Sequence, residues 1–265
     1  MDTPRLLLVL STLAFVSGVI HAFVVLRAGG WKESRWHLAP MALGFLFQSG
    51  FLYLRGQQDG RCPITSLYEV LIFIGWSIVL LYFLVGPAYR LSLLGVFTAP
   101  LVASLQIAAL ASRFDTLKPP PLRHGPGSDT ALLELHASIA LIAYAAFALA
   151  CVTGVMFLLQ DYLLKRHRVH ALFHQLPPIQ SLGKAIFRMV LLGVLLLSGA
   201  LALTFGIHLP VTNAKLLLAW LVWGAYLVIL ILMWRRTLTA RQTAWLAVVG
   251  YAIPMATLWI VTGAP

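Results

Sequence analysis

The sequence has very few charged residues: 10% of its side chains are Asp, Glu, Lys or Arg, and only eight are acidic. Hydrophobic residues make up 60% of the chain. Soluble globular domains carry about 25% charged residues, so this composition excludes a soluble domain. It indicates an integral membrane protein.

The chain also lacks long polar stretches. Eight apolar runs can be marked, each long enough to cross the roughly 30 Å hydrocarbon core of a bilayer. They cover residues 5–27, 38–55, 66–86, 91–111, 132–163, 185–206, 214–234 and 243–262. The first run has no clean small-residue cleavage site after a short core, so we expect a retained span rather than a signal peptide. We therefore predict one all-α domain over residues 1–265, a polytopic membrane helix bundle with eight transmembrane helices.

The net charge of +11 comes from basic residues scattered through short loops. Without a long basic arm or a soluble basic face, nucleic acid is excluded as a partner. With the N-terminus outside, twelve of the 19 Lys and Arg residues lie on the cytoplasmic side. The other seven are Arg5, Arg55, Arg61, Arg113, Lys118, Arg123 and Lys215. The positive-inside rule therefore predicts that the N-terminus and the C-terminus are both outside.

Only two cysteines are present, Cys62 in a predicted outer loop and Cys151 near the middle of the fifth span. Their depths differ by more than the roughly 7 Å that a disulfide can bridge. No disulfide and no paired-thiol redox motif is predicted.

The stretch from Glu134 to Lys165 contains one histidine, His136, close to its outer end. An ionisable side chain inside the edge of a membrane span is costly, so it is a functional candidate. At 100° per residue, a stripe of mostly small residues lies within about 40° of His136, and such a stripe lets a helix or a flat molecule come close. Its members are Ala140, Ala143, Phe147, Ala150 and Gly154. The alternative is that His136 only donates a hydrogen bond to a neighbouring helix.

The other histidines differ in their expected depth. His208, in the short loop between the sixth and seventh spans, shares the outer face with His136, whereas His21 lies toward the opposite face. The cytoplasmic loop carries His167, His170 and His174, whose spacing suits a metal site. Because thiolate and carboxylate ligands are lacking nearby and the neighbours are basic, a solvated basic flank is the better interpretation.

The outer loop before the third span ends in Pro63, Thr65 and Ser66, which predict a helix start. Glu69 falls in the first turn of that helix, where a carboxylate is favoured.

Four stretches together resemble the cytochrome c assembly family, a group of eight-span membrane proteins that includes CcsA and its shorter HemX-like and YpjD-like relatives. These stretches are CPITSLYEVLIFIGW at 62–76, ELHASIALIAYAAFAL at 134–149, LPPIQSLGKAIFR at 176–188 and NAKLLLAWLVWGAY at 213–226. The histidine that matches His136 is thought to be an axial haem ligand in the family. The resemblance thus implies a non-covalent, b-type haem at the outer face, bound by His136.

His208 is then the predicted second axial ligand of the haem iron, with His124 as the next candidate. Glu69 and Arg61, at the same level, are predicted to order the haem propionates or the second nitrogen of the ligand. No catalytic residues are predicted.

The chain differs from haem-presenting members of the family. Their tryptophan-rich signature before the seventh span corresponds here to IHLPVTNAKLLLAW, and no histidine follows the last span. The shorter HemX-like branch is the closer match.

Two functions stay open. The first is a haem-binding factor in cytochrome c maturation, in the bacterial inner (plasma) membrane, with other maturation proteins or apocytochrome c as possible partners. The second is a non-enzymatic scaffold or regulator of haem supply that binds no haem. A small-molecule transporter ranks third, because no charged residue lies in mid-span.

Overall fold

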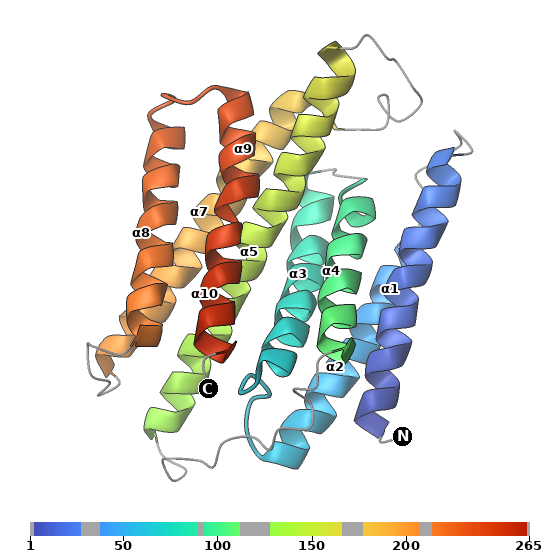
Figure 1. Ribbon diagram of the computed structural model, residues 1–265, viewed down its shortest axis with the longest axis vertical. Coiled ribbons are helices and arrows are strands. Elements are labelled where there is room, and N and C mark those ends of the chain that lie inside the picture. The colour runs from blue at the N-terminus through green and yellow to red at the C-terminus, as the bar shows by residue number, and fades with distance from the viewer. Residues whose placement is uncertain are drawn as a thin grey trace.

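The structure is a computed structural model that describes residues 3–27, 38–89, 93–111, 128–165, 177–206 and 214–263. Within these ranges the regular elements are all helices, and no strand occurs (Figure 1). The prediction of an all-α bundle is therefore confirmed.

The helices follow one another along the chain. They are α1 (Thr3–Arg27), α2 (Ala39–Asp59), α3 (Leu67–Tyr89), α4 (Leu94–Ala111), α5 (Ser128–Lys165), α7 (Ile179–Leu203), the 3₁₀ turn η3 (Thr204–Gly206), α8 (Ala214–Trp234), α9 (Ala240–Gly250) and α10 (Ala252–Gly263).

Seven segments in the described part of the chain are long and apolar enough to cross a membrane, and α9 with α10 forms one of them. Helix α2, which covers the predicted run 38–55, is not among the seven. Its last five residues, RGQQD, are polar. A multi-pass membrane protein is thus confirmed, whereas the eighth crossing stays a prediction.

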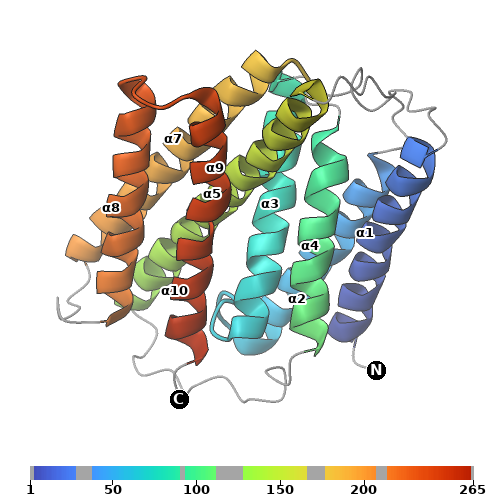
Figure 2. The ribbon, with the colours of Figure 1, turned by 45° about the horizontal axis from the view of Figure 1, so that its top comes forward.

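Helix α5 lies at the centre of the bundle and packs against α3, α4, α7 and α9 (Figure 2). Its 38 residues give a length of about 57 Å, well beyond the hydrocarbon core. The middle of the helix, from Ala143 to Ala150, is entirely buried. Helix α5 therefore positions the helices that pack against it.

Two glycines let other helices approach α5 closely. Gly193 of α7 lies directly against the ring of Phe147, where a Cβ atom would overlap the ring. Gly154 of α5 faces α9, and a Cβ atom there would lie 2.9 Å from the Ala244 carbonyl oxygen. The small stripe predicted along α5 therefore brings helices together, as small residues do in membrane interfaces.

Buried polar side chains hold α1 to its neighbours. Ser11 donates a hydrogen bond to the Gly44 carbonyl of α2 at 2.8 Å. Gln106 of α4 donates to the Ser11 hydroxyl at 3.1 Å and accepts from Thr12 at 3.0 Å. Because no water competes inside a bilayer, such bonds fix which helices meet.

The last predicted span is divided into two helices. Helix α9 ends at Gly250, Tyr251 forms a turn, and α10 begins at Ala252 with Pro254 in its first turn. A proline lacks the N–H group that would bond to the carbonyl four residues earlier, here that of Gly250. Pro254 thus interrupts the helical hydrogen bonding at Tyr251, although the backbone angles of Tyr251 remain helical (φ −65°, ψ −19°).

Replacing Gly193 by Ala should destabilise the protein. The added methyl group overlaps Phe147, whose ring cannot retreat because it stacks on Tyr226 at a centroid distance of 3.6 Å. Overpacking of this kind costs about 1–3 kcal/mol. Thermal unfolding of the detergent-purified protein, followed by circular dichroism, measures the loss.

The matched control is Gly199→Ala in the same helix, because a Cβ atom at Gly199 meets nothing within 4 Å. We expect this variant to be as stable as the wild type or more stable by up to about 1 kcal/mol, since Ala favours helix. Equal effects of the two substitutions would contradict the close contact.

Candidate functional site

His136 lies in the third turn of α5, half-buried against α7. Its Nδ1 atom is 2.6 Å from the carbonyl oxygen of Ala200. A carbonyl oxygen only accepts hydrogen bonds, so Nδ1 carries the proton. In the neutral imidazole the lone pair is then on Nε2, which makes Nε2 the atom available to a metal.

This hydrogen bond is the contact expected from the alternative interpretation of His136, in which the histidine only donates a hydrogen bond to a neighbouring helix. It is also the contact that orients histidine ligands, which almost always donate their other ring N–H to a carbonyl or carboxylate. For His136 this partner is the Ala200 carbonyl, while the roles of Glu69 and Arg61 beside a haem stay predictions.

The loop between α2 and α3 packs against the same end of α5. The backbone N–H of Cys62 donates to Glu134 at 3.3 Å, and the Cys62 sulfur lies 3.7 Å from the Ser138 hydroxyl. Glu134 and Ser138 are each two positions from His136, about 160° away around the helix. The end of α5 that carries His136 is therefore held between α7 and this loop.

The two cysteines do not form a disulfide, as predicted. Burial raises the pKa of the Cys62 thiol, an effect that the hydrogen bond with Ser138 opposes and that Glu134 and Glu69 reinforce. Because the thiolate is the reactive form, Cys62 is a poor nucleophile at neutral pH.

Glu69, at the start of α3, is almost fully buried, with 1% of its surface exposed. Its Oε2 atom accepts hydrogen bonds from the Thr65 N–H at 2.9 Å, the Thr65 hydroxyl at 2.8 Å and the Ser66 N–H at 3.4 Å. The Ser66 hydroxyl accepts in return from the Glu69 N–H at 3.2 Å. This reciprocal pair is a capping box, and it confirms the predicted helix start.

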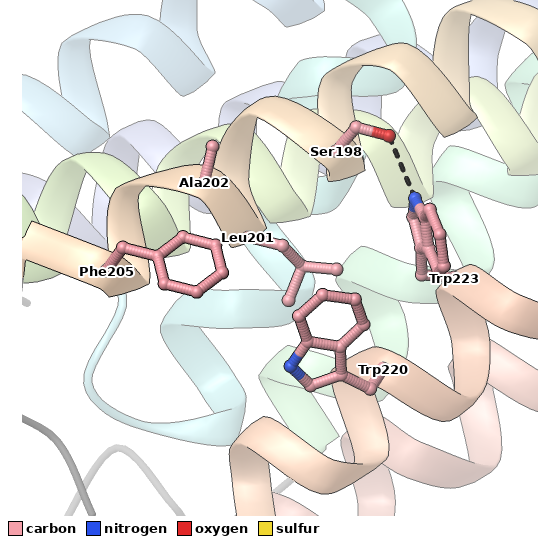
Figure 3. Close-up of a pocket in the computed structure, with 6 residues that line it drawn as sticks. All are labelled: Ser198, Leu201, Ala202, Phe205, Trp220 and Trp223. Carbon is pink, nitrogen blue, oxygen red and sulfur yellow. Dashed lines mark hydrogen bonds between the residues drawn. The ribbon is translucent and has the colours of Figure 1, made fainter. Parts of the chain in front are cut away.

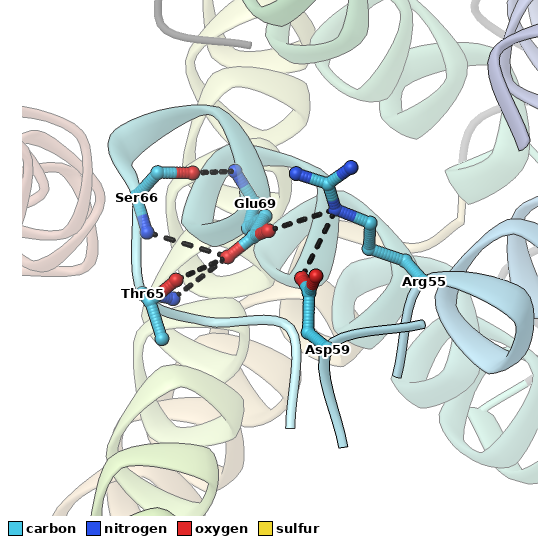
Figure 4. A network of polar contacts seen from close by, with 5 residues as sticks. All are labelled: Arg55, Asp59, Thr65, Ser66 and Glu69. Carbon is cyan, nitrogen blue, oxygen red and sulfur yellow. Dashed lines mark hydrogen bonds and ion pairs between the residues drawn. The ribbon is translucent and has the colours of Figure 1, made fainter. Parts of the chain in front are cut away.

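The other oxygen of Glu69 accepts a hydrogen bond from Nε of Arg55 at 3.2 Å. Arg55 also forms an ion pair with Asp59 at 3.2 Å (Figure 4). With one oxygen bonded to Arg55 and the other to Thr65 and Ser66, the Glu69 carboxylate links α2 to the start of α3. Arg61 is half-buried in the loop, next to Cys62.

The remaining predicted residues are distributed as follows. His208 and His124 lie outside the described residues, as do His167, His170 and His174. His21 is exposed near the far end of α1, a helix that packs against α2 and α4 rather than against the His136 site. Within the described ranges there is no group of three or more His, Cys, Asp or Glu side chains arranged for a metal ion.

An open aromatic groove lies between the end of α7 and α8 (Figure 3). Its lining residues are Ser198, Leu201, Ala202, Phe205, Trp220 and Trp223. The Trp223 indole N–H donates to the Ser198 hydroxyl at 2.8 Å, and the two tryptophan rings meet edge to face at 5.4 Å. Ser198 and Ala202 point about 160° away from Ala200 around α7, so the groove and His136 lie on different faces of that helix.

Sequence reasoning missed the Ala200 carbonyl and the contact of Glu134 with the Cys62 loop. A backbone carbonyl leaves no signal in a sequence. Glu134, an acidic residue two positions before His136, was a visible signal.

These observations define a class of protein: a multi-pass helical membrane protein with an oriented histidine at one end of its central helix. The family model described as "Cytochrome C assembly protein" matches residues 64–262. The chain therefore belongs to the cytochrome c assembly family.

Individual relatives agree with this assignment. The chain is 28% identical to Protein HemX of Brevibacillus brevis over 200 residues, which cover 74% of this chain and 72% of the relative. It is 31% identical to the cytochrome c biogenesis protein CcsA of Chlorella vulgaris over 111 residues, 40% of this chain and 34% of the relative. For a Synechococcus CcsA the identity is 33% over 123 residues, 46% and 35% of the two chains. The matches to these CcsA proteins thus span about a third of their length.

Replacing Glu69 by Ala should lower the free energy of unfolding by about 1–3 kcal/mol, because buried N–H groups and Arg55 lose their acceptor. Glu69→Gln should cost less, since a glutamine still serves in a capping box. The comparison is Asp59→Ala, which removes the more exposed partner of Arg55 and should cost at most about 1 kcal/mol. Thermal unfolding measures all three, and equal losses for Glu69→Ala and Asp59→Ala would contradict the capping role.

Proposed function

We propose that this protein is a haem-binding membrane factor of cytochrome c maturation, which holds or passes haem at the outer face of the membrane. The observation that carries the proposal is the hydrogen bond from His136 Nδ1 to the Ala200 carbonyl, which leaves Nε2 as the ligand atom. Bound haem would supply an iron with axial positions, for which a neutral imidazole is a common protein ligand.

The surroundings of His136 fit this role. A backbone carbonyl cannot be lost by side-chain movement, so the ring is held in one tautomer and one orientation. The contacts of Cys62 with Glu134 and Ser138 fix the same turn of α5 from the other side. His136 is thereby preorganised as a ligand.

The second axial ligand in this proposal is His208, with His124 as the next candidate. Arg61 is the proposed partner of a haem propionate, because its loop packs against the His136 end of α5. Glu69 acts indirectly, since its carboxylate holds the start of α3 and the end of α2.

The proposed topology has eight crossings with both termini outside. Helix α1 begins and α10 ends at the same end of the bundle (Figure 2), which fits an even number of crossings. Helix α2 packs along α1 and returns the chain to that end. The distribution of Lys and Arg supports the outer assignment of this end, where α5 begins.

The proposed setting is the bacterial inner membrane, with other maturation proteins or apocytochrome c as partners. These proposals rest on the family and on the relatives named for cytochrome c biogenesis.

A scaffold or regulator of haem supply that binds no haem is the second candidate. The observation that favours it is the same bond to Ala200, which satisfies a half-buried histidine without any ligand. A visible spectrum of the purified protein separates the two functions, because only the first gives a Soret band.

Reporter fusions test the topology. Fusions after Arg90, within 169–180 and after Arg241 should report the cytoplasm, whereas fusions after Gln58, Leu122 and Pro265 should report the outer side. The physical reason is the excess of basic residues on the proposed inner side. An outer signal from the 169–180 loop would reverse the orientation and move His136 to the cytoplasmic face.

Substitution of His136 tests the ligand role. Both His136→Ala and His136→Asn should abolish the Soret band, but Asn can still donate its amide N–H to the Ala200 carbonyl and should preserve thermal stability. His208→Ala should shift the spectrum to five-coordinate haem. The matched control is His21→Ala, which should leave haem content unchanged.

Two outcomes would overturn this assignment. A wild-type protein without haem would favour the scaffold function. Unchanged haem content after replacement of both His136 and His208 would show that the haem ligands are elsewhere.

A further inference from the structure

The hydroxyl groups of two tyrosines lie deep in the bundle without a hydrogen-bond partner among the described residues. Tyr226 of α8 is 0% exposed, and Tyr251, at the turn between α9 and α10, is 8% exposed. Unpartnered buried hydroxyls are rare in folded proteins, because each loses its hydrogen bonds to water on folding. Two of them in one place require an explanation.

The position of Tyr226 is fixed by its neighbours. Its ring stacks on Phe147 at 3.6 Å with an interplanar angle of 15°, and Phe147 in turn lies against Gly193. At its far end, the hydroxyl oxygen lies 3.8 Å from the point where a Cβ of Gly250 would be. The hydroxyl is therefore directed at the backbone where α9 ends.

The backbone at the end of α9 also lacks a hydrogen-bond donor. Pro254 provides no N–H group for the carbonyl of Gly250, and the helix is interrupted at Tyr251. The phenol groups of Tyr226 and Tyr251 are close enough to interact electrostatically. Two hydroxyls and a carbonyl that lacks its usual helical donor thus gather at the break.

The remaining polar groups nearby already have partners. The Tyr144 hydroxyl is hydrogen-bonded to Thr257, whose own hydroxyl donates to the Pro254 carbonyl at 2.9 Å. The thiol of Cys151 points to the Val248 carbonyl at 3.9 Å. None of these groups lies within hydrogen-bond distance of either tyrosine hydroxyl, so no described residue supplies the missing partner.

We propose that the break between α9 and α10 is a hydration site in the middle of the membrane, where an ordered water molecule bridges the hydroxyls of Tyr226 and Tyr251 and the carbonyl of Gly250. A buried water makes about three hydrogen bonds to polar groups that would otherwise be unsatisfied, and these three groups provide that number. Water that inserts at a proline-disturbed helix is a recognised way to satisfy freed backbone groups in membrane spans.

The site is independent of haem binding. It lies about half way along α8 and at the midpoint of the α9–α10 span, whereas His136 is close to one end of α5. It can therefore be tested in the protein with or without haem.

Radiolytic hydroxyl-radical footprinting of the purified protein is the decisive test, because a buried side chain is labelled only where water is bound beside it. Tyr226 and Tyr251 should be labelled in the folded protein. Phe147, which is equally buried and stacked on Tyr226, should not be labelled. Replacing Tyr251 by Phe should reduce the label at Tyr226, since the shared water is lost.

Stability gives a second measurement. Tyr226→Phe and Tyr251→Phe should each lower the unfolding temperature by about 2–4 °C, and the double variant should lose no more than the larger single loss. The control is Tyr53→Phe, which removes an exposed hydroxyl of α2 and should change nothing. Hydroxyls that truly lack a partner would instead make the Phe variants equally or more stable.

Absence of label at both tyrosines overturns the proposal whatever the stability of the variants. Labelled tyrosines with single variants that are as stable as the wild type would also overturn the bridging role, because the water would then contribute no bonds of consequence.

Discussion

The contact between α5 and α7 is the interaction on which the rest of the structure depends. At mid-height it is made by Phe147 against Gly193, where the absence of a side chain on one helix admits an aromatic ring from the other. Nearer the end of α5, the same pair of helices is close enough for His136 to reach the Ala200 carbonyl. A single interface therefore sets both the packing of the core and the orientation of the candidate ligand.

Much of this arrangement could be predicted from the sequence, because long apolar runs and a stripe of small residues have direct structural consequences in a bilayer. The start of α3 was equally readable, since Thr65, Ser66 and Glu69 have the spacing of a capping box. The Ala200 carbonyl was not, because which backbone atom faces a histidine depends on how two distant helices are aligned. Whether α2 crosses the membrane was also difficult to predict, because its apolar residues and its polar C-terminal end belong to one helix.

The first two helices lie outside the region that matches the family, which begins at residue 64. They are nevertheless bonded to it through side chains inside the bundle. Gln48 of α2 donates to the Ile72 carbonyl of α3 at 2.8 Å, and Gln106 of α4 bonds to Ser11 and Thr12 of α1. Arg55 adds an ionic link from α2 to Glu69. Side-chain bonds therefore connect α1 and α2 to the helices of the matched region.

The length of α5 has a consequence for the way the protein sits in lipid. A helix of about 57 Å is too long for a hydrocarbon core of roughly 30 Å, and it crosses the bundle obliquely (Figure 1). Such a hydrophobic mismatch is relieved by tilting, so a thicker bilayer makes the helix more upright and a thinner one lays it over. We therefore expect the acyl-chain length of the surrounding lipids to set how far the His136 end stands above the headgroups, which reconstitution into bilayers of graded thickness would measure.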